Sequence, residues 1–197
     1  MADIRFLTNK KGEKIAAVVP IEDWKQLKPH YRILKEDEEE ELAAPKLERR
    51  KKPLFVVKQS PIHGRGVFAA TKIRKGTPVI EYKGQLISED EADTRYSDEQ
   101  NGHHHTVLFS VDDDMVIDAS KKGNEAKYIN HSCDPNCEAV QYGRRVFIEA
   151  IRDIKKGEEL SYDYHLQVEK PHTKKKLAQY VCYCGAKNCR GTQVDLG

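Results

Sequence analysis

Between residues 54 and 164 the chain consists of short β-prone runs separated by turn residues, and this pattern limits the fold more than any other feature. Each run is only a few residues long and is bounded by Gly, Asp, Asn or Pro, which favours strands over helices. The runs occupy residues 54–58, 77–82, 106–111, 115–119, 144–150 and 159–164. We therefore predict a mainly β domain with short helices.

Two short helices are expected among these strands. Ser88 and Glu91 have the spacing of a capping box, which predicts a helix over residues 88–96. Residues 124–129 are expected to form another turn or two of helix.

The region before residue 53 has a different character. Residues 4–8 and 14–19 flank a Gly-containing turn and predict a hairpin, and a helix follows from Pro20 with Trp24 on its apolar face. This strand-strand-helix module over residues 1–30 resembles small antitoxin-like modules of bacteria. Residues 31–53 are mostly charged and are interpreted as an exposed helix followed by a linker.

Composition bounds the setting of the protein. The chain has 197 residues, of which 38% are hydrophobic and 34% charged, which fits one domain with a small appendage and solvated arms. No run is long and apolar enough for a membrane span, and the first residues lack a secretory signal. We expect an intracellular protein, cytoplasmic if the source is a bacterium. If the source is a eukaryote, a nuclear location is the alternative, because residues 49–52 (RRKK) then offer a nuclear-localisation patch in place of plain solvated surface.

Five motifs follow one another in a fixed order. They are HGRGVFA (63–69), EYKGQLI (81–87), YINHSCDPN (128–136), GEELSYDY (157–164) and CYCGAKNC (182–189). In this order they resemble the SET-domain protein lysine methyltransferases that carry a post-SET zinc segment, over residues 54–192. The resemblance implies a SET fold of small curved sheets with a pseudoknot-like active site. It assigns residues 54–164 to the SET domain, 165–181 to an insertion and 182–197 to the post-SET segment.

The glycine loop and the Asn-His turn are the candidate cofactor site. Gly64, Arg65 and Gly66 provide backbone that a ligand can approach closely, although a lone Gly-x-Gly is also typical of a plain turn. The resemblance implies that this loop binds S-adenosylmethionine, that the Asn130 side chain meets its amino group and that the His131 backbone meets its adenine. It also assigns Tyr162 to this site.

The polar atoms of the turn around Asn130 are expected to lack partners until the cofactor binds. The alternative is a capped turn whose Asn and Asp bond their own backbone.

The cysteines indicate a metal centre. Cys182, Cys184 and Cys189 supply three thiolates, one short of the four that closed zinc sites prefer. The resemblance implies that Cys133 is the fourth ligand, so that zinc holds the tail against the cofactor turn. Free thiols are the alternative, and Cys137 is expected to be a buried apolar residue.

Catalysis requires an uncharged lysine amine, and a free lysine has a pKa near ~10.4. A narrow apolar channel with tyrosine hydroxyls would disfavour the ammonium and orient the amine. The resemblance makes Tyr164 the catalytic tyrosine, Tyr82 a channel wall and Tyr162 a residue that favours mono- or dimethylation over trimethylation. Ordinary strand packing is the alternative for each tyrosine taken singly.

Three features fall outside this pattern. Val107 stands where many SET enzymes have Tyr, with His105 or Thr106 as possible substitutes. His103–His105 are interpreted as an exposed loop, because neighbours in an extended segment point to opposite sides and rarely share an ion. The lysines of residues 165–181 are interpreted as solvated, with acidic peptide flanks or nucleic acid as the alternative; direct nucleic acid binding is not expected.

We therefore expect a methyltransferase acting on a lysine-bearing protein or peptide, such as a histone or histone-like protein. A catalytically silent SET module that binds a peptide or partner as a scaffold is the alternative, supported by Val107. A third reading gives the function to the N-terminal module, as a partner- or DNA-binding piece.

Overall fold

The chain forms two units, residues 1–43 and 44–197. The computed structural model describes residues 5–8, 14–18, 43–47, 51–96, 107–112, 114–168 and 170–197, the first two ranges as backbone only. In the first unit β1 (Arg5–Thr8) pairs antiparallel with β2 (Lys14–Val18), which confirms the predicted hairpin. The helix expected from Pro20, most of the charged linker and His103–His105 lie outside the described residues.

The second unit contains most of the regular structure. Its strands are β3 (Phe55–Gln59), β4 (Arg65–Ala69), β5 (Pro78–Tyr82), β6 (Gln85–Ser88), β7 (Leu108–Ser110), β8 (Met115–Asp118), β9 (Asn130–His131), β10 (Cys137–Tyr142), β11 (Arg145–Ala150) and β12 (Ser161–Tyr162). The described helices are α2 (Glu89–Arg95), the 3-10 helix η1 (Glu125–Tyr128) and α4 (Lys174–Leu177).

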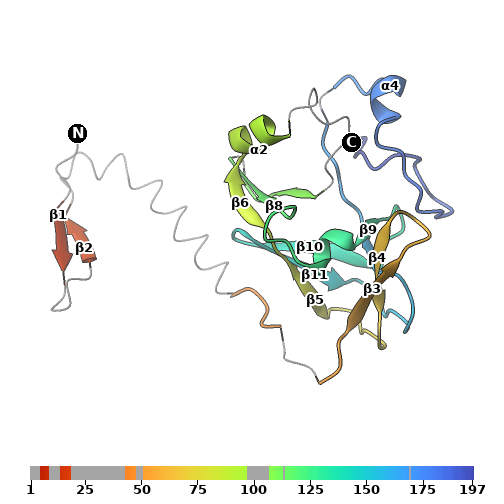
Figure 1. The fold of residues 1–197 in the computed structure, drawn as a ribbon, viewed down its shortest axis with the longest axis horizontal. Helices are drawn as coiled ribbons and strands as arrows, with labels where there is room; N and C mark the ends of the chain where they lie inside the picture. Colours follow the sequence, from red (N-terminus) through yellow and green to blue (C-terminus); the bar gives the residue numbers. More distant parts are fainter. Residues whose placement is uncertain are drawn as a thin grey trace. The chain divides into compact units, whose positions relative to one another are not determined.

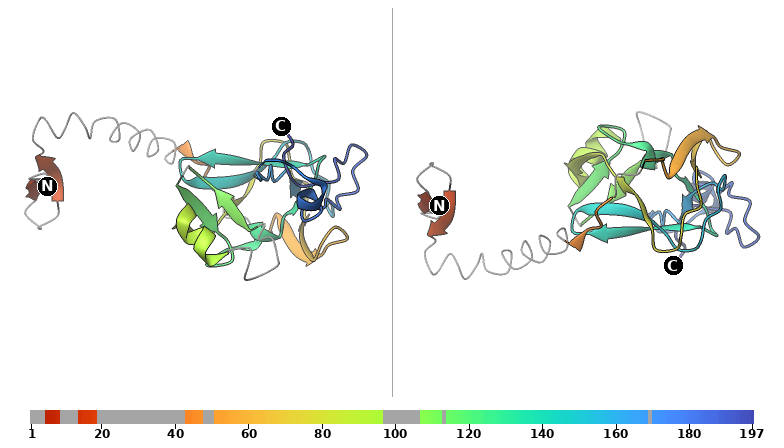
Figure 2. Two further views of the ribbon diagram at one scale, coloured as in Figure 1. Left: turned by 90° about the horizontal axis from the view of Figure 1, so that it is seen from above. Right: turned by 90° about the horizontal axis from the view of Figure 1, so that it is seen from below.

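The strands form small, separate sheets, as the short runs predict. Two have three strands, in the orders β10-β11-β5 and β6-β8-β7, and β3 and β4 form a hairpin. These pairs are antiparallel, whereas β9 and β12 pair in parallel. In the three views of Figure 1 and Figure 2, α2 and β6 lie away from the hairpin β3-β4, and β10 and β11 run past both.

The core forms around β11, the middle strand of its sheet. Val146, Phe147 and Ile148 are all fully buried, so this strand is covered on both faces. Ile129 and Leu160 are also fully buried, and each lies next to a short parallel strand that carries candidate site residues. Burial on this scale, about 25 cal/mol per Å² of apolar surface, stabilises the segments that hold the site.

The parallel pair β9-β12 is held by one buried side chain. Asn136, 2% exposed, accepts a hydrogen bond from the Ser161 N–H at 2.9 Å and donates to the Glu159 carbonyl at 2.7 Å. The side chain thus supplies the partners that a third strand would supply. It fixes the point at which residues 157–164 pass the turn after β9.

Most of the predicted elements are present, with shifted ends. The Ser88 hydroxyl accepts from the Glu91 N–H at 3.1 Å and caps α2, which confirms the predicted helix start. The last predicted strand, residues 159–164, is reduced to β12, because the flanking backbone bonds β4 and the turn instead. The sequence pattern missed β4, β6, β9, β10 and α4.

Candidate active site and metal centre

Three segments that are distant in sequence meet beside β4. The Ala69 N–H donates to the Glu158 carbonyl at 2.9 Å, and the Leu160 N–H donates to the Val67 carbonyl at 2.7 Å. Since β9 then pairs with β12, the glycine loop, the Asn-His turn and the strand of the tyrosines become neighbours. The fold thus brings together the candidate residues of three of the sequence motifs.

The two glycines of the loop are required for different reasons. Gly64 has φ +48°, a left-handed conformation that side chains disfavour, and a Cβ built there would meet no atom within 4 Å. At Gly66 a Cβ would collide with the Glu159 carboxylate and lie 2.9 Å from the Ser60 Cβ. The loop therefore has open backbone at Gly64 and a tight support beneath Gly66.

Arg65 contributes to the loop through its main chain. Its guanidinium lies over the Tyr128 ring, 3.8 Å from the ring centroid, and donates to the Tyr128 hydroxyl at 2.5 Å. Its carbonyl accepts a hydrogen bond from Asn130 at 3.1 Å. The Arg65 side chain itself packs against Tyr128, at the end of η1.

Asn130 is already fixed within the protein. Its Nδ2 donates to the Glu159 carboxylate at 2.8 Å and to the carbonyls of Arg65 and His63 at 3.1 and 3.3 Å. The expectation that the turn's polar atoms lack partners is wrong for this nitrogen, and among the described residues only Gln193 Oε1 is a fully buried side-chain atom without a partner. Three acceptors around Nδ2 orient the amide, which leaves Oδ1 as the atom that can accept from a ligand amino group.

His131 is buried at 4% exposure and bonds through its ring. Its Nδ1 accepts from the Tyr164 main-chain N–H at 3.2 Å, and its Nε2 lies 3.5 Å from the Cys133 sulfur. Burial, together with the Arg190 charge, lowers the pKa of His131 to about 4 despite the nearby Asp163 carboxylate. The imidazole is therefore neutral at physiological pH.

Tyr82, Tyr162 and Tyr164 form one aromatic cluster. The rings of Tyr162 and Tyr164 lie 4.9 Å apart, and the Tyr164 hydroxyl donates to the Ile129 carbonyl at 2.8 Å. Burial, and then the neighbouring phenols, raise the pKa of Tyr82 and Tyr162 well above the ordinary value, and burial raises that of Tyr164. All three are neutral phenols over the whole physiological range.

The hydroxyls of the cluster differ in their partners. The Tyr82 hydroxyl donates to the Val107 carbonyl at 2.9 Å, a main-chain contact that does not depend on the Val107 side chain. The Tyr162 hydroxyl makes no hydrogen bond within the described residues, although the residue is 5% exposed. The cluster thus has one hydroxyl available to an amine or a water molecule.

Four cysteine sulfurs converge next to this cluster. The sulfurs of Cys133, Cys182, Cys184 and Cys189 all lie within 4.8 Å of one another. Cys133 is 3.8 Å from Cys182 and 3.9 Å from Cys189, sulfur to sulfur. Tetrahedral zinc with Zn–S bonds of about 2.3 Å places its sulfurs about 3.8 Å apart, so donor type and spacing both fit zinc. Cys137 lies apart, 1% exposed in the core, and burial raises its pKa to about 12.

A charged pair ties the cysteine segment to the tyrosine strand, and sequence patterns gave no sign of it. Arg190 donates from its two terminal nitrogens to both oxygens of Asp163, at 2.5 and 2.6 Å. Although burial acts to raise it, hydrogen bonds from Arg190 and from the His165 N–H hold the pKa of Asp163 below its ordinary value. Glu159 was also missed; it accepts from Ser60 and Asn130 and supports Gly66.

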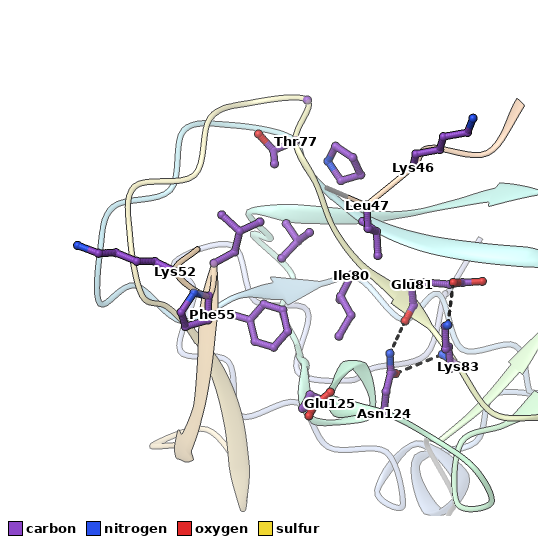
Figure 3. A pocket seen from close by; sticks show the side chains of 15 residues that line it. Lys46, Leu47, Lys52, Phe55, Thr77, Ile80, Glu81, Lys83, Asn124 and Glu125 are labelled. Atoms are coloured by element: carbon purple, nitrogen blue, oxygen red, sulfur yellow. Dashed lines mark hydrogen bonds and ion pairs between the residues drawn. The ribbon is translucent and has the colours of Figure 1, made fainter. Parts of the chain in front are cut away.

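Two of the grooves on the surface of this unit are candidate substrate sites. One, of about 650 Å³, contains Tyr164 and is bounded by β7, the start of β10 and residues 163–167. The other, of about 750 Å³, lies along β5 and is shown in Figure 3. There Asn124 bonds the main chain of Glu81 and Lys83 and covers part of the β5 edge (Figure 3). Because none of the predicted site residues lines the second groove, the first is the candidate substrate groove.

None of the helices within the described residues has the length and apolar character that crossing a bilayer demands.

Comparison with known proteins identifies the family to which the chain belongs. The family model described as SET domain matches residues 64–165. A histone-lysine N-methyltransferase, H3 lysine-4 specific, of Saccharomyces cerevisiae is 42% identical over 78% of this chain, and one of Schizosaccharomyces pombe is 44% identical over 74%. The histone-lysine N-methyltransferase trr of Drosophila melanogaster is 42% identical over 67%. The chain spans 14%, 15% and 5% of the length of these three relatives.

Proposed function

Because the chain belongs to the SET-domain family of protein lysine methyltransferases, we propose that it transfers a methyl group from S-adenosylmethionine to the amine of a protein lysine. The observation that carries this proposal is the convergence of the Asn130-His131 turn with the cluster of Tyr82, Tyr162 and Tyr164. The cluster offers aromatic walls and neutral hydroxyls, which suit an uncharged amine better than an ammonium.

The cofactor would be held by the loop and the turn. S-adenosylmethionine supplies an electrophilic methyl group on a positively charged sulfur. The main chain at Gly64 faces open space, where a carboxylate could approach its N–H groups, and the free Oδ1 of Asn130 is an acceptor for an amino group. Glu159 supports both elements from below, so the two contacts are built before any ligand arrives.

The tyrosines would orient the amine and exclude water. Neutral phenols with raised pKa values take no proton from an ammonium at neutral pH, so the lysine must enter the cluster already uncharged. Tyr164 is held by its hydrogen bond to the Ile129 carbonyl and is the proposed catalytic tyrosine. Positioning and desolvation, not covalent catalysis, then provide the rate.

The groove of about 650 Å³ is the proposed substrate site. Strand β7 lies at the edge of its sheet, with β8 on one side and no further strand among the described residues. An extended peptide can add to such an edge by main-chain hydrogen bonds and direct one side chain toward Tyr164. The relatives named for histone H3 lysine-4 support a histone or histone-like tail as substrate, and a substrate of this kind favours a nuclear location if the source is a eukaryote.

The cysteines are the proposed zinc centre, with Cys133, Cys182, Cys184 and Cys189 as ligands. Zinc at this position would hold residues 182–197 beside the turn that carries Asn130. Structural zinc contributes directly to folding, so the metal completes the wall of the site rather than taking part in methyl transfer.

Transfer of a labelled methyl group tests the function. Purified chain and labelled cofactor are incubated with a histone-containing protein pool, and mass spectrometry identifies the modified lysine. We expect labelled lysine with the wild type. Cofactor and peptide binding without any transfer would instead support the silent scaffold.

The product is proposed to be mono- or dimethyllysine. The Tyr162 hydroxyl has no protein partner within the described residues and can hold a water in the space that a more methylated amine needs. Tyr162→Phe should therefore raise the trimethyllysine fraction of the product, measured by mass spectrometry. Abundant trimethyllysine from the wild type would contradict the proposal.

A further inference from the structure

The two ring nitrogens of His131 have different roles. The Tyr164 main-chain N–H can only donate, so Nδ1, 3.2 Å away, must accept and carries no proton. The Asp163 oxygen 3.5 Å from Nδ1 does not reverse this assignment, because Arg190 and the His165 N–H already bond the carboxylate. The proton of the neutral imidazole therefore lies on Nε2.

Nε2 faces the cysteine cluster. It lies 3.5 Å from the Cys133 sulfur, a normal distance for an N–H group that donates to sulfur. Such a bond to a metal-bound thiolate orients the ligand and adjusts its charge, and loss of comparable outer contacts lowers metal affinity by about 10- to 100-fold.

Nδ1 faces the tyrosine strand. It fixes the main chain at Tyr164, whose ring meets the His131 ring edge-on at 5.3 Å between centroids. The Tyr164 hydroxyl is fixed separately, at the Ile129 carbonyl. The ring of His131 therefore contacts Tyr164 and Cys133 at the same time, and it is 4% exposed.

We propose that His131 is a positioning residue that joins the zinc centre to the catalytic tyrosine, with Nε2–H held by the Cys133 thiolate and Nδ1 holding the Tyr164 main chain. The role at Tyr164 rests on the proposed function. The role at Cys133 rests on the cysteine cluster alone. Binding of zinc and placement of Tyr164 are thereby coupled through one side chain.

Two substitutions of His131 test its contact with Cys133 and its contact with Tyr164 separately. His131→Asn keeps an acceptor near the position of Nδ1 but removes the donor to Cys133. His131→Gln keeps a donor near the position of Nε2 but removes the acceptor for the Tyr164 N–H. For the Asn variant we expect zinc release to a chelator to quicken about 10- to 100-fold, with a smaller loss of kcat on the zinc-loaded protein than in the Gln variant. For the Gln variant we expect near-normal zinc release and a kcat at least about 10-fold lower.

The matched controls are His172→Asn and His172→Gln. His172 lies in the insertion, where its Nε2 bonds the Val168 carbonyl. Neither variant should change zinc release or kcat. Cobalt substituted for zinc adds a spectroscopic reading, because the thiolate-to-cobalt absorption should shift in His131→Asn and not in His131→Gln.

Parallel loss of zinc and kcat in both His131 variants would overturn the proposal, since a simple packing role predicts it. Histidine-selective nitrogen NMR of the zinc-loaded wild type needs no substitution: we expect the His131 proton on Nε2, and a proton on Nδ1 overturns the assignment. If the wild type transfers no methyl group, the proposed function fails, whereas zinc release and NMR still decide the Cys133 half.

Discussion

At the scale of single residues, the site is held largely by main-chain acceptors. Tyr82 and Tyr164 direct their hydroxyls to the carbonyls of Val107 and Ile129. A main-chain carbonyl is present whatever the side chain, so Val107 in place of a family tyrosine leaves the Tyr82 contact intact. This weakens the main argument for a silent scaffold.

Removal of the Tyr164 hydroxyl should separate activity from stability. Tyr164→Phe loses one hydrogen bond, to the Ile129 carbonyl, which is worth about 1 kcal/mol of unfolding free energy. The amine would lose its orienting group, so we expect methyl transfer to fall by at least about 100-fold. Radiolabel transfer and chemical denaturation measure the two effects; a variant with wild-type activity would remove Tyr164 from the mechanism.

The raised tyrosine pKa values determine the pH profile. A phenol whose pKa is raised keeps its proton as the pH rises, so the hydroxyls of Tyr162 and Tyr164 stay protonated beyond pH ~10. The substrate amine must lose its proton, and its fraction uncharged grows with pH toward its own pKa. We expect kcat/KM to rise steadily from about pH 7 to 9 without a falling limb, with circular dichroism confirming the fold at each pH. A bell-shaped profile with its maximum below pH 8 would contradict this account.

The residues that sequence could identify were those to which the motifs assign a chemical role. The four cysteines, the Asn130-His131 pair and the three tyrosines converge as expected. Glu159, Asp163 and Arg190 were not predicted, because a charged residue gives no sign of its partner in a chain of which 34% of the residues are charged. The two hydrogen bonds from Arg190 to Asp163, called the Arg190 fork from here on, join side chains that are 27 residues apart in the sequence.

At the scale of elements, the short strands are held by hydrogen bonds from side chains as well as by main-chain hydrogen bonds to neighbouring strands. Asn136 and Asn124 each provide an amide that takes the place of a neighbouring strand, at β12 and at the β5 edge. Sequence periodicity located most of the strands. It did not predict the parallel pair β9-β12, because two-residue strands carry no period and their register depends on Asn136.

The Arg190 fork should stabilise the link between the tail and the tyrosine strand. Arg190→Lys keeps the charge but loses the planar pair of donors to Asp163, so we expect a loss of about 1–2 kcal/mol of unfolding free energy. Arg152→Lys is the matched control. Its ion pair with Glu158 is exposed, with 51% of the Arg152 side chain accessible, and should change stability by under about 0.5 kcal/mol. Equal effects of the two substitutions on urea denaturation would refute a special role for the fork.

At the scale of the whole second unit, the proposed active site is bordered by a segment whose cysteines can hold a metal ion. The loop at Gly64, the turn at Asn130 and the tyrosines belong to one folded core, whereas residues 182–197 join it through Cys133, the Arg190 fork and short bridges. Sequence motifs predicted this arrangement because ligand spacing is visible in a sequence. The predicted domain boundaries at residues 30, 53 and 164 remain predictions.

The most direct test is methyl transfer by the full chain before zinc removal, after removal by a chelator, and after zinc is returned. Because the proposed zinc would hold the tail against the cofactor turn, we expect transfer to be lost with zinc and restored with one zinc ion per chain. Undiminished transfer by the zinc-free protein, or no transfer by the zinc-loaded protein, would contradict the account.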